Sequence, residues 1–358
     1  MAELHLNIVP KLGLKEGTRK PLSNRPGLGG RGETSLRRRI GTALLIVGTG
    51  TLADGIIDHL RKDARSSYRL IGCLDRAGTK NRSAHVIGDF EDLQDVVASE
   101  RVRHVVVALS ERRGALPLDQ LLDCKLRGVR VEDGTAFYET LTGKIPLAGL
   151  NPGFFIFGDG FRRPTEAAKR GIDLLLSTLC LLLAAPLFLL LPLLIRLTSQ
   201  GPVFYRQERV GQNGSRFSML KFRSMVDRAE GQGKAVWAVE NDPRVTRMGK
   251  FMREFRLDEL PQLLNVFRGD MSFVGPRPER PEFVEQLREV IPFYPLRHTV
   301  KPGITGWAQV RFHYGATVQD AAEKLQYDLY YIKHMSVVFD CRIAFRTIRV
   351  VLFRSGAR

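Results

Sequence analysis

The feature that most constrains this chain is an apolar run from Leu174 to Ile195, 22 residues without a charge. As an α-helix this run would be about 33 Å long, which matches a bilayer core of about 30 Å. Pro186 and Pro192 fall inside the run. Each proline removes a backbone donor and bends a helix. The sequence therefore predicts a bent membrane helix over residues 172–196.

Basic residues flank the apolar run on both sides, with Lys169 and Arg170 before it and Arg196 after it. A helix that crosses a membrane usually carries its cationic excess on one side only. The flanks and the prolines therefore favour a re-entrant helix that enters and leaves by one face. A kinked helix that spans the membrane remains the alternative. A helix buried in a soluble core is disfavoured by the length of the run.

The region before the apolar run alternates short apolar segments with helix-like ones. Strands are expected at residues 43–47, 69–75, 104–110 and 128–133, and a helix is expected over 91–100. Strands that alternate with helices indicate a parallel sheet. We therefore expect a Rossmann-like domain over residues 41–145, so that the chain as a whole is of the α/β class.

A glycine pattern follows the first of these strands. Gly48, Gly50 and Ala53 fit G-x-G-x-x-G/A, and Asp75 lies 25 residues after Gly50. Such glycines permit a tight turn at a helix N-terminus that can hold a pyrophosphate, and the acid then meets a ribose. Gly48, Gly50 and Asp75 are therefore nucleotide-binding candidates. The same loop also occurs in domains that bind no dinucleotide. Short-chain redox catalysis is disfavoured, because no tyrosine has a lysine four residues later.

The chain is strongly basic, with a formal net charge of +17 over 358 residues. Such a charge favours a polyanionic partner: nucleic acid, acidic lipid or a phosphorylated substrate. Nucleic acid is disfavoured, because no recognition motif combines aromatic and basic residues. Residues 1–40 are expected to be a basic disordered tail, and residues 146–168 a linker rich in Gly and Phe. The four cysteines are far apart, which indicates neither a zinc site nor a disulfide framework.

Dense motifs follow the apolar run: KFRSM at 221–225, FRLDELPQLLNVFRGDMSFVGPRPE at 255–279 and PGITGWAQV at 302–310. Through these motifs, residues 169–358 resemble the bacterial sugar transferase family. Its members are polyprenyl-phosphate glycosyl-1-phosphate transferases, also called monotopic phosphoglycosyl transferases. The preceding Rossmann-like region resembles the domain found before the transferase in larger members. The resemblance implies a mainly helical, membrane-associated transferase domain over 169–358.

The resemblance also implies a reaction. A sugar-1-phosphate moves from a nucleotide diphosphate sugar to a polyprenyl (undecaprenyl) phosphate, with Mg²⁺, through a phosphosugar–aspartyl intermediate. This step would initiate synthesis of an exopolysaccharide, O-antigen or other glycoconjugate on the cytoplasmic face of a bacterial inner membrane. Anionic lipids are implied partners, and the sequence leaves open whether the chain forms a homodimer. The alternative is a non-catalytic membrane protein that senses nucleotides through its Rossmann-like domain.

An adjacent acid pair, Asp258 and Glu259, provides the candidate catalytic groups. Pro261 lacks an N–H and belongs in the first turn of a helix, so the pattern alone predicts an N-cap at Asp258. A helix N-terminus favours anions, which is compatible with chemistry there. The resemblance makes Asp258 the nucleophile and Glu259 the Mg²⁺ ligand, with Asp258 as a second candidate ligand.

Positioned cations should stabilise the charge that develops on a leaving phosphate. The candidates in the matching motifs or directly before them are Arg253, Arg277, Lys221 and Arg223. Other residues leave alternatives open. Trp307 is expected either at the membrane interface or in the core. Three residues near the C-terminus would either face a nucleotide or close the fold: Tyr327, Asp328 and Tyr331. Three arginines at helical spacing predict a basic amphipathic helix on anionic lipid: Arg342, Arg346 and Arg349.

Overall fold

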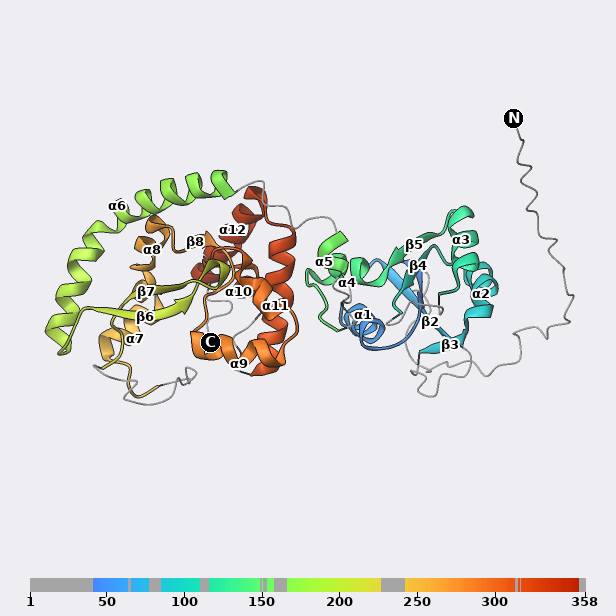
Figure 1. Cartoon of the computed structure of the whole chain (residues 1–358), viewed down its shortest axis with the longest axis horizontal. Coiled ribbons are helices and arrows are strands. Elements are labelled where there is room, and N and C mark those ends of the chain that lie inside the picture. The colour runs from blue at the N-terminus through green and yellow to red at the C-terminus, as the bar shows by residue number, and fades with distance from the viewer. Residues whose placement is uncertain are drawn as a thin grey trace, which may run out of the picture. The chain divides into compact units, whose positions relative to one another are not determined.

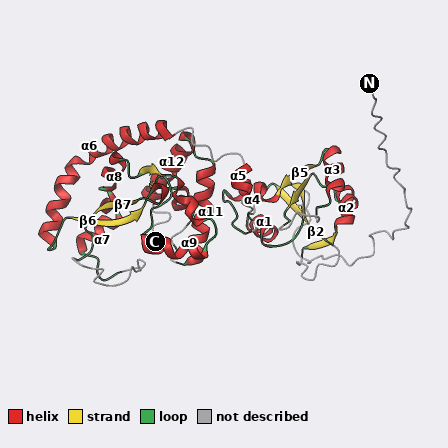
Figure 2. Cartoon of the chain, in the orientation of Figure 1, coloured by secondary structure: helices red, strands yellow, loops and turns green. Residues whose placement is uncertain are grey.

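The computed structural model shows an α/β chain with a parallel sheet in its N-terminal part and a mainly helical C-terminal part (Figures 1 and 2). It describes residues 41–63, 66–76, 85–109, 116–148, 150, 153–157, 166–226, 242–312, 315 and 317–353. The predicted tail, 1–40, and about half of the predicted linker, 146–168, lie outside the described residues.

Five parallel strands form the N-terminal sheet in the order β3-β2-β1-β4-β5. The strands are β1 (Thr42–Val47), β2 (Tyr68–Asp75), β3 (Val86–Asp89), β4 (His104–Val107) and β5 (Arg130–Asp133). Four of them confirm the predicted strands, and β3 was not predicted. The strand order reverses between β1 and β4, which is the arrangement that defines the binding crevice of a Rossmann-type sheet.

Helices cover both faces of this sheet. They are α1 (Thr51–Lys62), α2 (Leu93–Ser99), α3 (Leu118–Leu126) and α4 (Gly134–Thr142), with a 3₁₀ turn, η3 (Phe90–Asp92), before α2. One buried cluster joins α1 and α4 to the sheet, and a second joins α2 and α3 to its other face. Central strands buried on both faces explain the uniformly apolar sequence of β1, whose residues Leu44–Val47 are fully buried.

A single bent helix, α6 (Glu166–Thr198), contains the apolar run (Figure 1). Among the described helices it alone is long and apolar enough to cross a membrane. Pro186 and Pro192 lie inside it and account for the bend, because proline interrupts the helical hydrogen bonds. The predicted bend is confirmed, and the helix begins six residues earlier than expected, while the choice between a re-entrant and a spanning helix stays a prediction. Only 17% of its most apolar window is buried, so a soluble core helix does not describe it.

Both ends of α6 are fixed to the C-terminal part. Near its start, Asp173 accepts hydrogen bonds from the Ser272 hydroxyl (3.1 Å) and the Phe273 amide (3.0 Å). Near its end, Leu191 and Ile195 are buried in a cluster with Phe222. The middle of the helix instead presents leucines that are half to four-fifths exposed, among them Leu175, Leu179, Leu182, Leu183 and Leu189. The helix therefore arches over one folded body.

That body is a set of helices around two small strand pairings. A β-hairpin joins β6 (Phe204–Val210) to β7 (Arg216–Phe222), and β8 (Ser272–Val274) pairs in parallel with β9 (Gly303–Thr305). The remaining elements are α5 (Gly153–Phe157), η4 (Gln212–Gly214), α7 (Arg247–Glu254), η5 (Leu257–Glu259), α8 (Gln262–Arg268), α9 (Pro281–Val290), η6 (Tyr294–Thr299), α10 (Trp307–Arg311), α11 (Val318–Lys333) and α12 (Val337–Phe353).

Trp307 lies in the core of this body, which decides between its two expected places. It is 6% exposed and packs against Tyr330 and Phe339, with Arg346 of α12 over its ring. Its indole N–H donates to the carbonyl oxygen of Gly143, just after α4 (2.9 Å). The indole therefore satisfies a backbone carbonyl at a helix end, a group that would otherwise lack a partner.

Candidate active site

Asp258 and Glu259 lie in the short 3₁₀ turn η5, directly before α8. The predicted N-cap at Asp258 is wrong, because the α-helix begins one turn later, at Gln262, with Pro261 as its cap. Arg256 opens the turn with a φ of 54°, a left-handed conformation that costs a non-glycine residue of the order of 1 kcal/mol. Strain of this kind is common where side chains must be aimed at a ligand.

The acid pair rests on the long apolar helix. Leu257 and Leu260, which flank the pair, pack in the same cluster as Leu191 and Ile195 of α6 and Phe222 of β7. Apolar side chains on both sides of the turn are thus partly removed from water, which contributes less than the roughly 1.5–3 kcal/mol of a fully buried one. The two acids are held between this apolar floor and the cations of the neighbouring elements.

Glu259 is the centre of a charge cluster. Its Oε1 accepts from Lys221 Nζ of β7 at 3.1 Å and from Arg277 Nη2 at 2.8 Å. Its Oε2 lies 4.0 Å from Arg256 Nη1, beyond hydrogen-bonding distance. Burial alone would raise the pKa of Glu259, but Arg277 and Lys221 outweigh it and hold that pKa well below its usual range. Glu259 is therefore ionised, with one oxygen outside the two hydrogen bonds.

Asp258 has the opposite perturbation. It is 7% exposed, and burial raises the pKa of its carboxyl group, with Glu259 adding to the shift. Lys221 and Arg253 act against it. Burial also lowers the pKa of the Lys221 ammonium, although Glu259 opposes that change. Two adjacent acids with pKa values displaced in opposite directions are typical of sites where carboxylates take different roles.

The predicted cations do not all reach the acid pair. Lys221 and Arg277 contact Glu259 directly, whereas Arg253 Nε donates to the Ser224 hydroxyl at 2.9 Å. Arg223 turns the other way and donates to the carbonyl and hydroxyl oxygens of Ser199, after α6, both at 2.8 Å. Its buried Nε and Nη1 have no acceptor among the described residues. Arg223 thus links the end of β7 to the end of α6, and its Nε and Nη1 make no hydrogen bond within the described residues.

A second buried network holds the loop of Arg277. The backbone carbonyl of Arg277 accepts from Arg297 Nη2 at 3.0 Å, and Arg297 forms an ion pair with Asp328 of α11 at 2.9 Å. Tyr294 accepts a third hydrogen bond from Arg297 at 2.6 Å. Asp328 therefore closes the fold and does not face a nucleotide. Arg297 was missed by the sequence reasoning, and its only signal was the Tyr–x–x–Arg spacing at 294–297.

A polar row on β6 was also missed. Gln207 donates to the Tyr205 hydroxyl at 3.2 Å, and Arg209 donates to Gln207 and, at 3.0 Å, to the carbonyl of Pro278. Tyr205 is the cross-strand partner of Lys221, so this row lies on the same face of the hairpin as the active-site lysine. Polar residues at every second position, 205, 207 and 209, were the available signal.

The acid pair fits a Mg²⁺ ion that takes most of its ligands from a substrate. Magnesium in phosphate-transfer sites is bound through one or two carboxylates, with phosphate and water completing the shell. Glu259 Oε2 offers such an oxygen beside Asp258. No group of three or more His, Cys, Asp or Glu able to hold a metal occurs among the described residues. A Mg²⁺ site at the acid pair therefore stays a prediction.

The nucleotide-binding candidates of the N-terminal sheet are brought together at the end of β1. Gly48 and Gly50 have φ values of 107° and 118°, and a Cβ on Gly48 would lie 2.9 Å from the Ala108 carbonyl oxygen. Asp75 accepts from the Thr49 hydroxyl at 2.7 Å and from the Arg76 amide at 2.8 Å. The loop geometry matches the expected fingerprint, while the Asp75 carboxylate is used within the loop. Nucleotide binding here stays a prediction.

Together these features define an α/β protein with one exposed apolar helix and, packed against it, a buried acid pair bound by cations. The chain belongs to the bacterial sugar transferase family, because residues 164–354 match that family. It is 44% identical over 239 residues to a UDP-N-acetylgalactosamine-undecaprenyl-phosphate N-acetylgalactosaminephosphotransferase of Aeromonas hydrophila, which covers 66% of this chain and 56% of the relative.

Two further relatives differ in length. A UDP-glucose:undecaprenyl-phosphate glucose-1-phosphate transferase of Escherichia coli is 33% identical over 311 residues, 85% of this chain and 67% of the relative. An exopolysaccharide production protein of Rhizobium leguminosarum is 43% identical over 186 residues, half of this chain and 92% of the relative. The chain thus spans 56% and 67% of the two named phosphotransferases.

Proposed function

We propose that this protein transfers a sugar-1-phosphate from a nucleotide diphosphate sugar to a polyprenyl phosphate, as the first step in building a cell-surface polysaccharide. The observation that carries the proposal is the buried acid pair in η5, bound by Lys221 and Arg277 and seated on α6. A phosphate-transfer site needs acids, cations and, for a lipid acceptor, an apolar surface beside them. The names of the relatives point to undecaprenyl phosphate as the acceptor.

Asp258 acts as the nucleophile in this proposal. Its carboxylate oxygen forms a bond to the phosphorus that carries the sugar, and the bond to the nucleoside phosphate breaks, releasing a nucleoside monophosphate. The phosphate oxygen of the polyprenyl phosphate then attacks the same phosphorus and frees Asp258. Burial raises the pKa of Asp258 and makes its carboxylate more basic, while Lys221 and Arg253 favour the ionised form that attacks.

Glu259 and the cations hold the diphosphate. The pairing of Glu259 with Lys221 and Arg277 fixes both cations in the site before substrate binds, so little reorganisation is needed during the reaction. Mg²⁺, bound through Glu259 with Asp258 as a second ligand, would neutralise phosphate charge when present. The planar guanidinium of Arg277 is suited to contact two phosphate oxygens at once.

We further propose that α6 is re-entrant and that the catalytic part lies on the cytoplasmic face of the inner membrane. Support comes from the two ends of α6, since Asp173 and Ile195 are both fixed to the same folded body. A spanning helix would place those ends about 30 Å apart across the bilayer core. Lys169, Arg170 and Arg196 put positive charge at both ends, as expected for ends that stay on the cytoplasmic side.

The test uses the full chain in detergent with Mg²⁺, undecaprenyl phosphate and a panel of nucleotide sugars that includes UDP-glucose and UDP-N-acetylgalactosamine. We expect nucleoside monophosphate release with at least one sugar. Asp258→Asn should reduce turnover at least about 1,000-fold, as loss of a nucleophile does. Glu254→Gln, an exposed neighbouring acid on α7, is the matched control and should keep full activity.

Two results would contradict the proposal. One is the absence of nucleoside monophosphate release across the panel. The other is loss of folding in Asp258→Asn, measured by thermal unfolding, which would give the residue a structural role. The second candidate function, nucleotide sensing without catalysis, rests on the turn at Gly48 and Gly50. It predicts nucleotide binding that Asp258→Asn leaves intact and no turnover in the wild type.

A further inference from the structure

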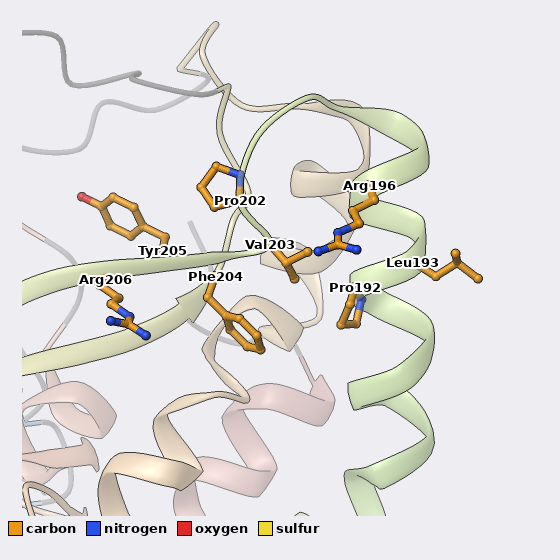
Figure 3. A pocket seen from close by; sticks show the side chains of 8 residues that line it. All are labelled: Pro192, Leu193, Arg196, Pro202, Val203, Phe204, Tyr205 and Arg206. Atoms are coloured by element: carbon orange, nitrogen blue, oxygen red, sulfur yellow. The ribbon is translucent and has the colours of Figure 1, made fainter.

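The two faces of strand β6 have different surroundings. Figure 3 shows Tyr205 on one side of the strand and Phe204 on the other. Phe204 stacks on Phe222, with ring centroids 5.4 Å apart, and Phe222 belongs to the apolar cluster on α6. Tyr205 is instead the cross-strand partner of Lys221, which donates to Glu259 at 3.1 Å. Tyr205 therefore lies on the face of the hairpin that carries the active-site lysine.

A chain of hydrogen bonds along the polar row orients the Tyr205 hydroxyl. Arg209 donates to Gln207 Oε1 through Nε at 3.1 Å and through Nη2 at 2.5 Å, so the amide oxygen of Gln207 faces Arg209. The amide nitrogen of Gln207 then donates to the Tyr205 hydroxyl at 3.2 Å. An amide nitrogen can only donate, so the Tyr205 oxygen accepts this bond and its O–H proton is directed away from Gln207. The row thus presents Tyr205 as a hydrogen-bond donor.

The other end of the polar row is fixed to the loop that carries the second active-site cation. Arg209 Nη1 donates to the carbonyl of Pro278 at 3.0 Å, and Pro278 directly follows Arg277. Arg277 and Lys221 both donate to Glu259 Oε1. From position 205 to position 209 a strand extends about 13 Å. The row therefore connects the strand of Lys221 with the loop of Arg277, the two elements that hold Glu259.

Tyr205 is open enough to meet a ligand, since it is 36% exposed. In the proposed reaction the sugar is attached to the phosphorus that Asp258 attacks, whereas the nucleoside lies beyond the second phosphate. Lys221 and Arg277 supply the charge that phosphates require. The Tyr205 hydroxyl is an uncharged donor and suits an uncharged acceptor, such as a sugar hydroxyl or an N-acetyl carbonyl oxygen. A neutral donor beside Lys221 is therefore placed to meet the sugar.

We propose that the Tyr205 hydroxyl binds the sugar of the nucleotide sugar and selects between sugars, with Gln207 and Arg209 as positioning residues. The inference rests on the proposed function and adds a specificity-determining contact to it. A site that donates a hydrogen bond to one sugar oxygen disfavours sugars that lack this oxygen, because the donor then has no partner. Loss of the Tyr205 hydroxyl should therefore reduce the discrimination between sugars.

The experiment combines a change in the protein with a change in the sugar. The preferred substrate is first identified among UDP-glucose, UDP-galactose and their two N-acetylhexosamine counterparts. Analogues of it that each lack one hydroxyl or the acetyl group are then compared in wild type and in Tyr205→Phe, which removes the hydroxyl and keeps the ring. Wild type should lose about three- to tenfold in kcat/KM on the analogue without the contacted oxygen. Tyr205→Phe should show that loss on the preferred substrate and no further loss on that analogue.

Two other variants of β6 test the orientation of the contact. Arg206→Gln is the matched control, because Arg206 is exposed and lies on the face of the strand opposite to Tyr205 (Figure 3). It should leave the discrimination between sugars unchanged. Gln207→Met, which can no longer donate to the Tyr205 hydroxyl, should weaken the same discrimination that Tyr205→Phe weakens. A purely structural role would instead lower kcat/KM by one factor for every analogue.

A binding arm, which does not depend on turnover, titrates Asp258→Asn and Asp258→Asn/Tyr205→Phe in detergent with the same UDP-sugars and with UMP. The double variant should bind the preferred UDP-sugar about three- to tenfold more weakly and UMP equally well.

Three results would overturn the inference: no coupling with any analogue, an equal effect of Arg206→Gln, or equally weakened UMP binding, which would place the nucleoside at Tyr205. Binding that depends on the sugar, without turnover, would contradict only the proposed function. Absence of binding for every UDP-sugar would contradict both.

Discussion

Replacing Arg297 with Met should weaken this protein in two separable ways. Arg297 and Asp328 are 6% and 1% exposed, and their ion pair measures 2.9 Å. Removing one partner of such a pair leaves a buried charge uncompensated and costs about 3–5 kcal/mol. In a chain of 358 residues that should lower the melting temperature by about 4–7 °C. The double variant Arg297→Met/Asp328→Leu removes the second charge as well and should recover most of the lost stability.

Activity should not recover with stability. Arg297 donates to the backbone carbonyl of Arg277 at 3.0 Å, and Arg277 donates to Glu259 at 2.8 Å. Both variants lose the donor that fixes the Arg277 loop. A small displacement of a positioned group can lower a rate by up to about 100-fold. We therefore expect kcat/KM to fall about 10- to 100-fold in the single and the double variant alike.

The stability of the single variant should also depend on pH. Burial raises the pKa of Asp328 to about 6, although Arg297 lowers it, so loss of Arg297 should raise the pKa further. The unfolded pKa of an aspartate is about 3.9, so the folded protein binds this proton more tightly. The contribution of the protonated Asp328 to stability is then fully present below about pH 4 and is lost as the pH rises through the folded pKa. The deficit of the single variant relative to wild type should be larger at pH 8 than at pH 5, and the stability of the double variant should lack the pH dependence that Asp328 contributes.

Thermal unfolding at pH 5 and pH 8 and nucleoside monophosphate release measure these three effects on one set of proteins. Arg268→Met, an exposed arginine, controls for the loss of a charge. Full activity in the double variant would show that Arg297 does not position Arg277. An unchanged melting temperature in the single variant would refute the argument from the buried pair.

Two further predictions concern the membrane helix and the metal. Single cysteines introduced at Glu166 and Gln200, in a background without Cys73, Cys124, Cys180 and Cys341, should be labelled from the same side of the membrane; labelling from opposite sides would establish a span. Chelation of Mg²⁺ should stop turnover reversibly, and Glu259→Gln should raise the Mg²⁺ concentration required at least about tenfold, because it removes a hard anionic ligand. Activity that persists in a chelator would exclude the metal role.

Much of the fold could be predicted because its determinants are local. Continuous apolar segments such as 43–47 indicate strands buried on both faces, and the glycines after β1 mark a turn that needs positive φ. The bend of α6 follows from its two prolines. These features depend on neighbouring residues alone, so they can be predicted from the sequence.

The acid pair shows where local reasoning stops. Pro261 fits the first turn of a helix that starts at Asp258 and fits equally well the cap of a helix that starts at Gln262. The second solution occurs because Leu257 and Leu260 pack on α6, some 60 residues earlier in the chain. A contact at that separation leaves no trace in the local pattern.

The cations show the same limit. Lys221 and Arg223, two positions apart, would share a face if the strand continued, but β7 ends at Phe222. Arg223 therefore contacts Ser199 and not the acid pair. Arg297 lies in a 3₁₀ segment outside the quoted motifs, and its role depends on Asp328 of α11. A buried ion pair between distant elements is a property of the packed fold.

The packing of η5 on α6 has a consequence for how this protein would respond to its membrane. Since Leu257 and Leu260 join the acid turn to the same helix that would sit in the lipid, no hinge separates the two. The height of the acids above the bilayer is then set by hydrophobic matching. A thicker or thinner membrane would tilt the whole catalytic part together with α6. Lipid composition would thus alter how the site approaches its lipid acceptor, while the spacing of the acids and cations stays the same.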